Sequence, residues 1–383
     1  MNRNFEDIVI VGGGPVGLYI AGRLLQLGYN CKVLEKKESI NPHSRSLGIH
    51  PISLELFENA GISQRFIEDG LKIRKGIAFW NRSKLGEIDF EQLPKPFNYI
   101  LAIPQSDTER ILQEWIQGLN SEVILRGAEV KSIQNEDESV TVKYQKDGEL
   151  TSINSRFLIG CDGLNSFVRK DLNIPFEGKH YPDTYIMGDF SDNSAFGEDA
   201  AVYLHEDGLI ESFPLPNGLR RWVLKTDHRI ENPDAELLGK LVHGRLGHSL
   251  NTTNNVMMSS FGVQHFLARH MSVGNVLLAG DAAHVVSPIG GQGMNLGWLD
   301  GEAAVQAIIL SLKNPADQSG LFLSYSKKQR RVAKKVAKRA ELNMWLGRKE
   351  TSNLLVKWAL TVILNTPLSA LLARLFTMRG LGR

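Results

Sequence analysis

The first forty residues alternate between apolar runs and polar turns in a pattern that predicts two strands with a helix between them. Residues 8–11 are all apolar, which is typical of a short strand buried on both faces of a sheet. Three glycines follow, and apolar residues between positions 18 and 25 then recur three or four positions apart, as on one face of a helix. Residues 31–34 form a second strand-like run. The predicted order is therefore strand, tight turn, helix and strand.

Farther along the chain, the pattern of apolar and polar residues changes twice. Residues 107–119 predict an amphipathic helix, and residues 122–160 predict paired strands, the last of them buried. From about residue 173 to 267, short alternating segments separated by Gly, Asn and Asp predict a second, largely antiparallel sheet. Residues 276–279 predict one more buried strand, and everything after residue 300 is expected to be helical.

The glycines between the first strand and the helix have the Gly-x-Gly-x-x-Gly spacing of a dinucleotide-binding turn. Gly12 makes the turn, Gly14 lets the backbone approach a pyrophosphate, and Gly17 lets the helix pack closely on the strand. Pro15 suits the first helical turn, whose unpaired N–H groups can bind phosphates. With 36 glycines in 383 residues, this spacing arises by chance about 0.3 times, so the flanking strand and helix carry the prediction.

Glu35 ends the second predicted strand. An acidic side chain at that place can accept hydrogen bonds from the two hydroxyls of a ribose. The carboxylate favours a nucleotide with a free 2′-hydroxyl, which sharpens the prediction of a bound dinucleotide.

Two later segments also join a strand to a turn that contains an acidic residue. Asp162-Gly163 follows one buried strand, and the acid either contributes to a cofactor site or merely caps the next helix. Gly280-Asp281 closes another strand, where the acid can bind a hydroxyl of a flavin side chain. Residues 288–295 then combine glycines with the start of a helix, so that backbone can approach a flat ring and the positive helix end can face it.

The composition excludes several classes of partner. The 44 basic and 42 acidic residues give a net charge of +2, which provides no overall field for nucleic acid. The two cysteines lie in apolar segments, as is typical of small buried residues in a reducing compartment, and the first seven residues lack the apolar core of a secretion signal. We therefore expect a cytoplasmic protein, and we predict no metal site.

Taken together, these motifs resemble those of the FAD-dependent aromatic hydroxylases, the group A flavoprotein monooxygenases related to para-hydroxybenzoate hydroxylase and the polyketide hydroxylases. The three family signatures occur in order, at residues 12–17, 162–163 and 280–281, and the last one extends through Asp300. Arg45 and Gln105 resemble family residues that contact the cofactor. The cofactor-binding residues that we predict are Gly12, Gly14, Pro15, Val16, Gly17, Glu35, Lys36, Arg45, Gln105, Asp162, Gly163, Gly280, Asp281, Pro288, Gly291, Gly293, Met294 and Asn295.

The resemblance implies a monooxygenase reaction. NADH or NADPH delivers a hydride to FAD, the reduced flavin reacts with O2, and a flavin C4a-hydroperoxide transfers one oxygen atom to an aromatic or polycyclic phenol-like small molecule. The family binds the nicotinamide transiently, and the chain has no second Gly-x-Gly-x-x-Gly after a strand. Asp162, Ser166 and Arg169 are candidates for a role shared between FAD and NAD(P)H.

No catalytic residue is assigned from the sequence. His284 follows Gly280-Asp281 closely, and we weigh it as a base that deprotonates a phenol, but a lone histidine is more often structural. Aromatic residues of the second sheet are candidates for substrate contacts, although residues at such spacing are more often core. They are Tyr203, His205, Phe213, Pro214 and Trp222.

Three rivals to the hydroxylase share features of this sequence. A flavin halogenase would carry a Trp-x-Trp-x-Ile signature, which is absent. A non-catalytic binder related to the GDP-dissociation inhibitors would not need the flavin motif at residues 280–295. A flavin-dependent reductase or dehydrogenase acting on lipid, like the geranylgeranyl reductases, is separated from a hydroxylase by oxygen uptake that depends on substrate.

The C-terminal part combines charge with apolarity. Residues 327–339 carry eight positive charges and no acid, and residues 354–376 are largely apolar. The basic run is either a solvated helix face or, together with the apolar segment, a contact with anionic lipid. Asn365, Pro367 and Arg374 interrupt the apolar segment, which argues against a membrane-spanning helix. We expect a monomer or a homodimer.

These expectations combine into an α/β fold with a Rossmann-like FAD-binding domain, an inserted, largely antiparallel β-sheet substrate domain, and C-terminal helices. The FAD-binding domain is predicted in three parts, at residues 1–75, 100–172 and 268–345. The substrate domain comprises residues 76–99 and 173–267. Residues 346–383 form the C-terminal helices.

Overall fold

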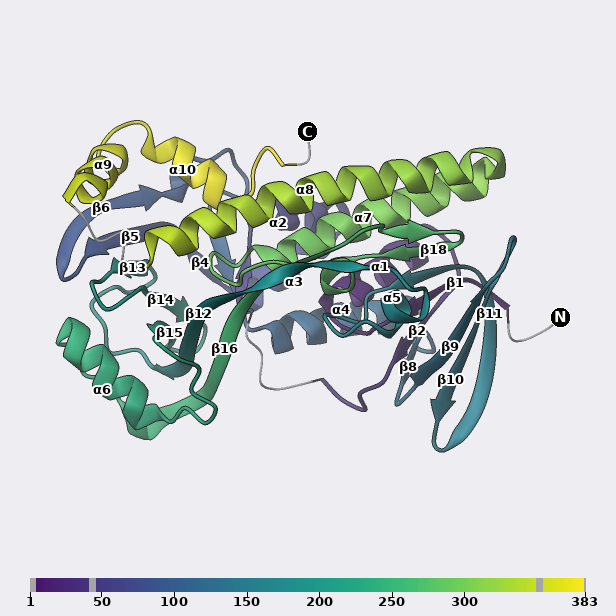
Figure 1. Cartoon of the computed structure of the whole chain (residues 1–383), viewed down its shortest axis with the longest axis horizontal. Helices are drawn as coiled ribbons and strands as arrows, with labels where there is room; N and C mark the ends of the chain where they lie inside the picture. Colours follow the sequence, from purple (N-terminus) through teal and green to yellow (C-terminus); the bar gives the residue numbers. More distant parts are fainter. Residues whose placement is uncertain (1–4, 41–45, 349–353, 382–383) are drawn as a thin grey trace.

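The computed structural model describes residues 5–40, 46–348 and 354–381, and it has the predicted α/β architecture. Figure 1 shows two sheets at opposite ends of the molecule, with the long helix α8 (Gln318–Leu346) running from one end to the other. The first sheet holds the strands from the start of the chain, and the second is built mostly from its middle.

The first sheet is mainly parallel and has β1 near its centre. Its strands follow the order β17–β18–β11–β1–β2–β8, and β9 and β10 extend β11 as an antiparallel meander. The sheet is apolar on both faces because helices cover it, as expected for parallel strands. Its strands are β1 (Phe5–Val11), β2 (Cys31–Glu35), β8 (Ile124–Arg126), β9 (Glu129–Asn135), β10 (Val140–Lys146), β11 (Glu149–Gly160), β17 (Ser272–Val273) and β18 (Val276–Leu278).

The helices on the first sheet follow from its crossover connections. The helix α1 joins β1 to β2, and it packs against α4 and α7. The predicted helix at residues 107–119 is confirmed as α4, which begins two residues earlier. These helices are α1 (Pro15–Gln26), α2 (Pro51–Asn59), α3 (Ser63–Asp69), α4 (Gln105–Leu119), α5 (Phe167–Asp171) and α7 (Gln292–Lys313).

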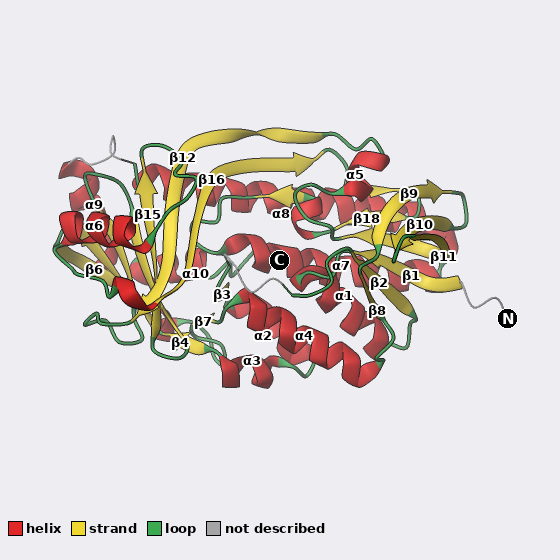
Figure 2. Cartoon of the chain, turned by 90° about the horizontal axis from the view of Figure 1, so that it is seen from below, coloured by secondary structure: helices red, strands yellow, loops and turns green. Residues whose placement is uncertain are grey.

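The second sheet is largely antiparallel, as predicted, with one parallel pair between β13 and β5. Its order is β19–β16–β12–β15–β14–β13–β5–β6. Figure 2 shows that β12 and β16 are long strands that reach from this sheet toward the first one. The strands are β5 (Lys75–Trp80), β6 (Ser83–Asp89), β12 (Phe176–Ser191), β13 (Ala200–Leu204), β14 (Ile210–Leu215), β15 (Leu219–Thr226), β16 (Asn255–Ala268) and β19 (His284–Val285).

The remaining short elements connect these layers. A three-stranded sheet has the order β3–β7–β4, with β3 (Gly48–Ile49), β4 (Leu71–Ile73) and β7 (Ile100–Ala102). Four short 3-10 helices are η1 (Phe90–Gln92), η2 (Thr252–Asn254), η3 (Gly280–Ala282) and η4 (Pro315–Asp317). The strand β19 belongs to the second sheet although its residues lie in the third predicted part of the FAD-binding domain. The domain boundaries stay a prediction.

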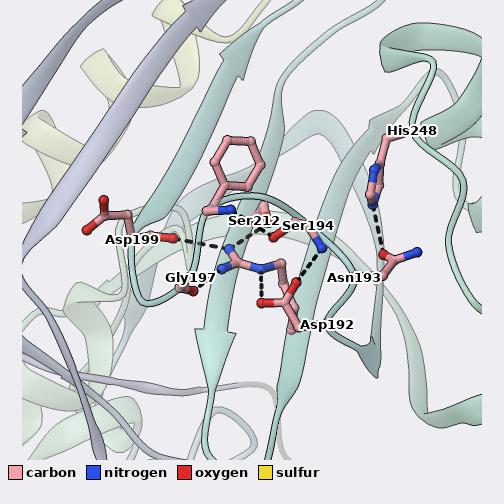
Figure 3. A network of polar contacts seen from close by, with 9 residues as sticks. Asp192, Asn193, Ser194, Gly197, Asp199, Ser212 and His248 are labelled. Carbon is pink, nitrogen blue, oxygen red and sulfur yellow. Dashed lines mark hydrogen bonds and ion pairs between the residues drawn. The ribbon is translucent and has the colours of Figure 1, made fainter.

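The two faces of the second sheet are covered differently. The helix α6 (Ala235–Leu246) closes one face over a core that includes Tyr203 and Trp222. Near this side, the fully buried Arg220 donates to Asp192 at 2.8 Å and to the Gly197 carbonyl at 2.6 Å, in the network of Figure 3. The arginine thereby fixes the loop between β12 and β13. The opposite face points toward the loop before α7.

The last part of the chain is helical, as predicted. The helix α8 (Gln318–Leu346) packs along α7, and the elements α9 (Leu354–Leu364) and α10 (Ser369–Phe376) contact β6. Within the described residues, none of the helices is by itself both long and apolar enough to cross a bilayer. The α9–α10 pair meets the length and composition test jointly, but its axis bends by 94°.

Candidate active site

Three loops leave the same edge of the first sheet. The register places Val11 of β1 beside Gly160 of β11, and Gly160 beside Leu278 of β18, with all three strands parallel. Their carboxyl ends therefore meet, and the chain continues from them into Gly12, Cys161 and Ala279. In open α/β sheets, ligands bind at this edge, where neighbouring strands diverge in chain order.

Gly12 and Gly17 have the structural roles predicted for them. Gly12 has a φ of +107°, and a Cβ there would lie 2.4 Å from the carbonyl oxygen of Cys161. A Cβ on Gly17 would lie 2.0 Å from the carbonyl oxygen of Gly12. Any side chain at either position would collide with backbone. The two glycines thus bring α1 and the Asp162 loop close to the end of β1.

Gly14 faces open space instead. A Cβ there would meet no atom within 4 Å, and the φ of −80° is accessible to any residue. Gly14 is also the N-cap of α1, which has no side-chain cap and no acidic residue in its first turn. Unpaired N–H groups at such a helix end favour an anion. The geometry suits the predicted pyrophosphate, and binding by Gly14, Pro15 and Val16 stays a prediction.

Glu35 is folded against the glycine turn. Its Oε2 accepts the Gly13 N–H at 2.6 Å, and its Oε1 accepts the Lys37 N–H at 2.9 Å. The carboxylate is thereby held at the end of β2, within reach of a nucleotide on the turn. Lys36 is exposed and lines a shallow polar hollow with Gly127 and Gly148.

Asp162 caps the helix that follows it, which is one of the two roles predicted for it. Its Oδ2 accepts the Val168 N–H at 3.1 Å, which satisfies the start of α5, while its buried Oδ1 has no partner among the described residues. Gly163 has a φ of +79°, and a Cβ built on it would meet no atom within 4 Å. A buried carboxylate oxygen without a donor is costly. Asp162 therefore retains an acceptor that a cofactor hydroxyl can satisfy.

Arg169 and Ser166 are buried and engaged locally. Arg169 is 4% exposed, and its guanidinium donates to the carbonyl oxygens of Ala282 and Leu164, both at 2.8 Å. Ser166 caps α5 by accepting the Arg169 N–H at 3.0 Å. Arg169 thus ties the Asp162 loop to the Gly280 loop. This burial favours local pairing over the shared FAD and NAD(P)H role considered for the two residues.

The Gly280 loop closes around the first motif. A Cβ on Gly280 would lie 3.1 Å from the Val16 side chain, and one on Gly297 would lie 2.5 Å from it. Trp298 donates to the Pro15 carbonyl oxygen at 3.0 Å. The three motifs, separated by more than 100 residues in the sequence, therefore meet around the first turn of α1.

Asp281 lies beside that junction. Its side chain is exposed, yet desolvation by the surrounding protein raises its pKa. Binding of a cofactor hydroxyl by Asp281 stays a prediction.

His284 forms a fully buried pair with Asp300. Its Nε2 contacts Asp300, which also accepts the Gly280 N–H at 3.1 Å. Burial disfavours the charged imidazole, but the contact with Asp300 outweighs burial and raises the pKa of His284. Both side chains are completely shielded from solvent. The pair supports the Gly280 turn, in agreement with the structural role favoured for His284.

The loop at residues 288–295 opens α7 with a second free helix end. Gly291, with a φ of +65°, is the N-cap, and neither a side-chain cap nor an acidic residue occupies the first turn. Asn295 is fully buried and makes four hydrogen bonds, to His50 N, Ser53 Oγ and the carbonyl oxygens of Gly48 and Gly291, at 2.8 to 2.9 Å. Its side chain fixes the loop, which leaves backbone N–H groups to face a ligand. Pro288 is exposed, and Gly293 and Met294 are half-buried.

Three further residues complete the account of the predicted site. Gln105 begins α4 and donates through its side chain to Glu109 at 2.8 Å. Arg45 lies outside the described residues. His50 was not predicted: it is buried next to Gly291, burial lowers its pKa to about 4, and its Nδ1 has no described partner.

The residues at this edge fit FAD. The turn at Gly14 is open, two helix N-termini carry no side-chain cap, and the buried oxygens of Asp162 and Gln292 have no partner in the described part of the chain. Donors for a pyrophosphate and acceptors for sugar-like hydroxyls are thus present together.

Comparisons with known proteins lead to the same cofactor. A sequence profile for a family described as FAD binding domain matches residues 6–340.

The chain belongs to this FAD-binding family. The resemblance found in the sequence, the fold class and the FAD cofactor are thereby confirmed. An uncharacterized aromatic compound monooxygenase, YhjG of Bacillus subtilis, is 33% identical over 342 residues, which are 88% of this chain and 67% of that protein. A rifampicin monooxygenase of Streptomyces venezuelae is 33% identical over 77% of this chain and 62% of its own length.

Several solved structures share the fold. The p-nitrophenol 4-monooxygenase PnpA from Pseudomonas putida DLL-E4 has a TM-score of 0.88 at 22% identity, with 99% of each chain covered. OxyS, an anhydrotetracycline hydroxylase from Streptomyces rimosus, has a TM-score of 0.80 at 26% identity and covers 98% of this chain and 76% of its own. Among the curated relatives, the chain spans 54 to 67% of the matched protein's length.

The second sheet carries a polar feature that was not predicted from the sequence. Of the aromatic candidates for substrate contacts, Tyr203 and Trp222 lie in the core under α6. The opposite face of the second sheet instead carries Tyr185 and Glu211, both buried. A lone acid within the apolar run of β14 was the signal available in the sequence.

Proposed function

We propose that this chain is an FAD-dependent monooxygenase that uses NADH or NADPH and O2 to insert one oxygen atom into an aromatic or polycyclic phenol-like small molecule. The proposal rests on one observation above all: three loops at the carboxyl edge of the first sheet converge on the first turn of α1. Relatives whose names specify monooxygenases acting on aromatic compounds support it.

The protein's own part is to hold and orient the cofactor. The N-terminus of α1 at Gly14 would bind the pyrophosphate, Glu35 and Asp162 would accept hydroxyl groups, and the N-terminus of α7 at Gly291 would face the ring. When bound, FAD supplies electron transfer from NAD(P)H and the activation of O2. Backbone N–H groups at the start of α7 would stabilise negative charge on a ring placed there.

The proposal does not use His284 as a base. The imidazole is fully buried, and its Nε2 is engaged with Asp300, which also accepts the Gly280 N–H. Proton acceptance from a phenol then belongs to another residue or to solvent.

Oxygen incorporation is the decisive test. Purified protein loaded with FAD is supplied with NADH or NADPH and a panel of phenols and polyketide intermediates under ¹⁸O2. The proposal expects a product that carries one ¹⁸O atom per molecule. Consumption of NAD(P)H without label in any organic product would contradict it and would favour the reductase alternative.

We also propose a contact of the α9–α10 segment with anionic membrane surfaces. Its outward residues Leu354, Leu355 and Trp358 are 69 to 80% exposed, and Leu368 and Leu371 are more than half exposed. Residues 354–381 contain no acidic residue, and Lys357 and Arg374 are basic, whereas Arg379 is paired with Glu55 at 2.9 Å. A contiguous apolar surface with positive charge is typical of helices that lie in a lipid interface.

Vesicle sedimentation tests this contact. The protein is expected to pellet with vesicles that contain an anionic lipid, less so as salt rises, and not with neutral vesicles. The double variant Leu355→Ser with Trp358→Ser should lose most of the binding, while Leu150→Ser, 66% exposed elsewhere, should retain it. Absence of salt-dependent binding would end the proposal. A variant that changes a dimer into a monomer would instead assign the surface to a second copy of the chain.

A further inference from the structure

Glu211 is a buried carboxyl that the protein does not satisfy. It lies in β14 and is 7% exposed, and its carboxyl has no hydrogen bond or ion pair among the described residues. Desolvation alone raises the pKa of Glu211 to about 7. Carboxylates are almost never buried unless paired, and one that lacks a partner needs an explanation.

The register of the sheet fixes the direction in which Glu211 points. Glu211 is paired with Val202 on one side and Val223 on the other, and Val223 is paired with Met187. Directly paired residues share a face of the sheet. The row therefore faces away from α6, toward the cluster that contains Val223 and Met187.

A second unsatisfied polar group belongs to the same cluster. Tyr185 precedes Met187 by two residues, so it shares this face. It is fully buried and stacks on Phe261, and its hydroxyl has no partner in the described ranges. The nearby charge of Glu211 contributes to raising its pKa, after burial itself. A carboxyl acceptor and a buried hydroxyl donor thus lack partners among the described residues on one face of the second sheet.

The cluster reaches the loop proposed to hold the flavin ring. Ile289, which lies between Pro288 and Gly291, packs in the same buried cluster as Tyr185, Met187 and Val223. The two unsatisfied groups therefore lie on the side of the sheet that faces the cofactor loop, where a substrate has to be positioned for oxygen transfer.

The charged residues around Glu211 are already paired with each other. Asp189 binds Arg221 in a two-pronged contact at 2.6 and 2.7 Å. Asp183 binds Arg348 at 2.7 Å and lies 3.6 Å from Lys225. Among the described residues of this face, each of these basic side chains already contacts an acid, so the surface does not suit a ligand carboxylate.

We propose that Glu211 and Tyr185 form a recognition pair for the hydroxyl group of a neutral, phenol-type ring, and that they exclude aromatic carboxylates. Glu211 accepts the hydrogen bond from the ligand hydroxyl, and Tyr185 donates one to the same oxygen. No bond is made or broken at this pair, which positions the ring against the loop at Ile289. This inference deepens the proposed function and rests on it for the place of the ring.

Equilibrium dialysis of the FAD-loaded protein tests the pair without reference to turnover. The probes are 2-naphthol, its methyl ether and 2-naphthoate, measured at pH 8.5, where Glu211 is ionised. The wild-type protein is expected to bind 2-naphthol about tenfold or more tighter than either of the other probes, because an unmatched buried polar group costs binding energy.

Two conservative variants separate the roles. Glu211→Gln removes the charge at nearly constant shape, and it should tighten 2-naphthoate binding about tenfold while weakening the preference for 2-naphthol. Tyr185→Phe should weaken 2-naphthol about fivefold and leave the exclusion of 2-naphthoate intact. The matched control Glu177→Gln changes an exposed acid of the same sheet and should alter no ratio.

The outcomes are decisive in both directions. If Glu211→Gln leaves both ratios within twofold of wild type, or if the wild-type protein binds 2-naphthoate as tightly as 2-naphthol, or binds none of the probes, the inference is overturned. Should Glu211→Gln fail to fold, an unchanged 2-naphthol affinity in Tyr185→Phe has the same consequence. Because dialysis requires no oxygen transfer, a protein that discriminates the probes but incorporates no ¹⁸O would contradict the proposed function and leave the recognition pair standing.

Discussion

The carboxyl edge of the first sheet and the face of the second sheet that packs on Ile289 carry different kinds of polar group. At the first sheet, the site consists mainly of backbone: Gly12 and Gly17 bring segments into contact, and Gly14 leaves room for an anion at a helix end. At the second sheet, the polar groups are the side chains of Glu211 and Tyr185, which share a face but come from two strands separated by β15.

The two sites should therefore tolerate different substitutions. A backbone site depends on the absence of side chains. It is therefore most sensitive to substitution at glycines where an added Cβ would clash with neighbouring atoms. A side-chain site depends on buried polar groups that lack partners in the protein. Such groups reduce stability, but they remain free to form hydrogen bonds with a ligand. The following substitutions test that contrast, beginning with the largest expected effect.

Gly12→Ala should damage the backbone-built edge most. The φ of +107° disfavours any side chain, and the new Cβ would lie 2.4 Å from the Cys161 carbonyl oxygen. Strain and overpacking together predict a loss of about 2–6 kcal/mol in the free energy of unfolding, measured by urea denaturation. Gly118→Ala in α4, where a Cβ meets nothing within 4 Å, is the control and should be neutral or stabilising. A loss below about 1 kcal/mol in Gly12→Ala would remove the basis of the contrast.

Glu211→Gln should change how stability depends on pH. A folded-state pKa of about 7 against 4.5 means that the native protein binds more protons between these values, so wild-type stability falls as pH rises through that window. The neutral variant lacks this loss. Its stability relative to wild type should increase by about 3 kcal/mol between pH 4.5 and 8. Parallel pH profiles of the two proteins in urea denaturation would show that Glu211 is not a destabilising buried charge.

Gly14→Ala should separate binding from folding at the first sheet. The added methyl meets no protein atom and needs no unusual φ, so stability should stay within about 0.5 kcal/mol of wild type. The methyl would nonetheless occupy the approach to the α1 N-terminus. We expect FAD affinity, measured by titration of the apoprotein, to fall about tenfold, equivalent to about 1.4 kcal/mol. Unchanged affinity would place the pyrophosphate elsewhere.

Glu177→Gln should produce the smallest effect of the series. Glu177 lies in the same sheet as Glu211, but it and Arg269 are both 61% exposed at a separation of 3.8 Å. Such surface pairs contribute less than about 0.5 kcal/mol to the free energy of unfolding. Their contribution is too small for salt screening to change stability measurably. A larger change in the melting temperature than in Glu211→Gln would show that burial does not distinguish the two acids.

Much of the first region could be predicted from sequence because its information is local. The order of strand, glycine turn and helix at residues 8–25 lies within eighteen consecutive positions, and the structure bears out the steric reasons for Gly12 and Gly17. The strands at residues 31–34 and 276–279 and the helices after 300 were predicted for the same reason, since periodicity is a property of neighbouring residues.

The second region depends on the strand register, which the sequence pattern did not specify. Tyr185 and Glu211 share a face only because β12 and β14 both pair with β15 in a particular alignment, and a shift by one residue would send each to the other face. Of the residues selected from the sequence as candidates for substrate contacts, Tyr203 and Trp222 proved to be core under α6. Asn295 likewise binds four protein groups, a role that only the folded loop reveals.

A crystal structure of the protein grown with FAD would show whether the three loops hold the cofactor. We predict the pyrophosphate at the N-terminus of α1 beside Gly14, ribose hydroxyls at Glu35, and the ring against residues 288–293 on the side of Ile289. Electron density for the pyrophosphate at any other helix end, or for a ring away from the loop before α7, would contradict it.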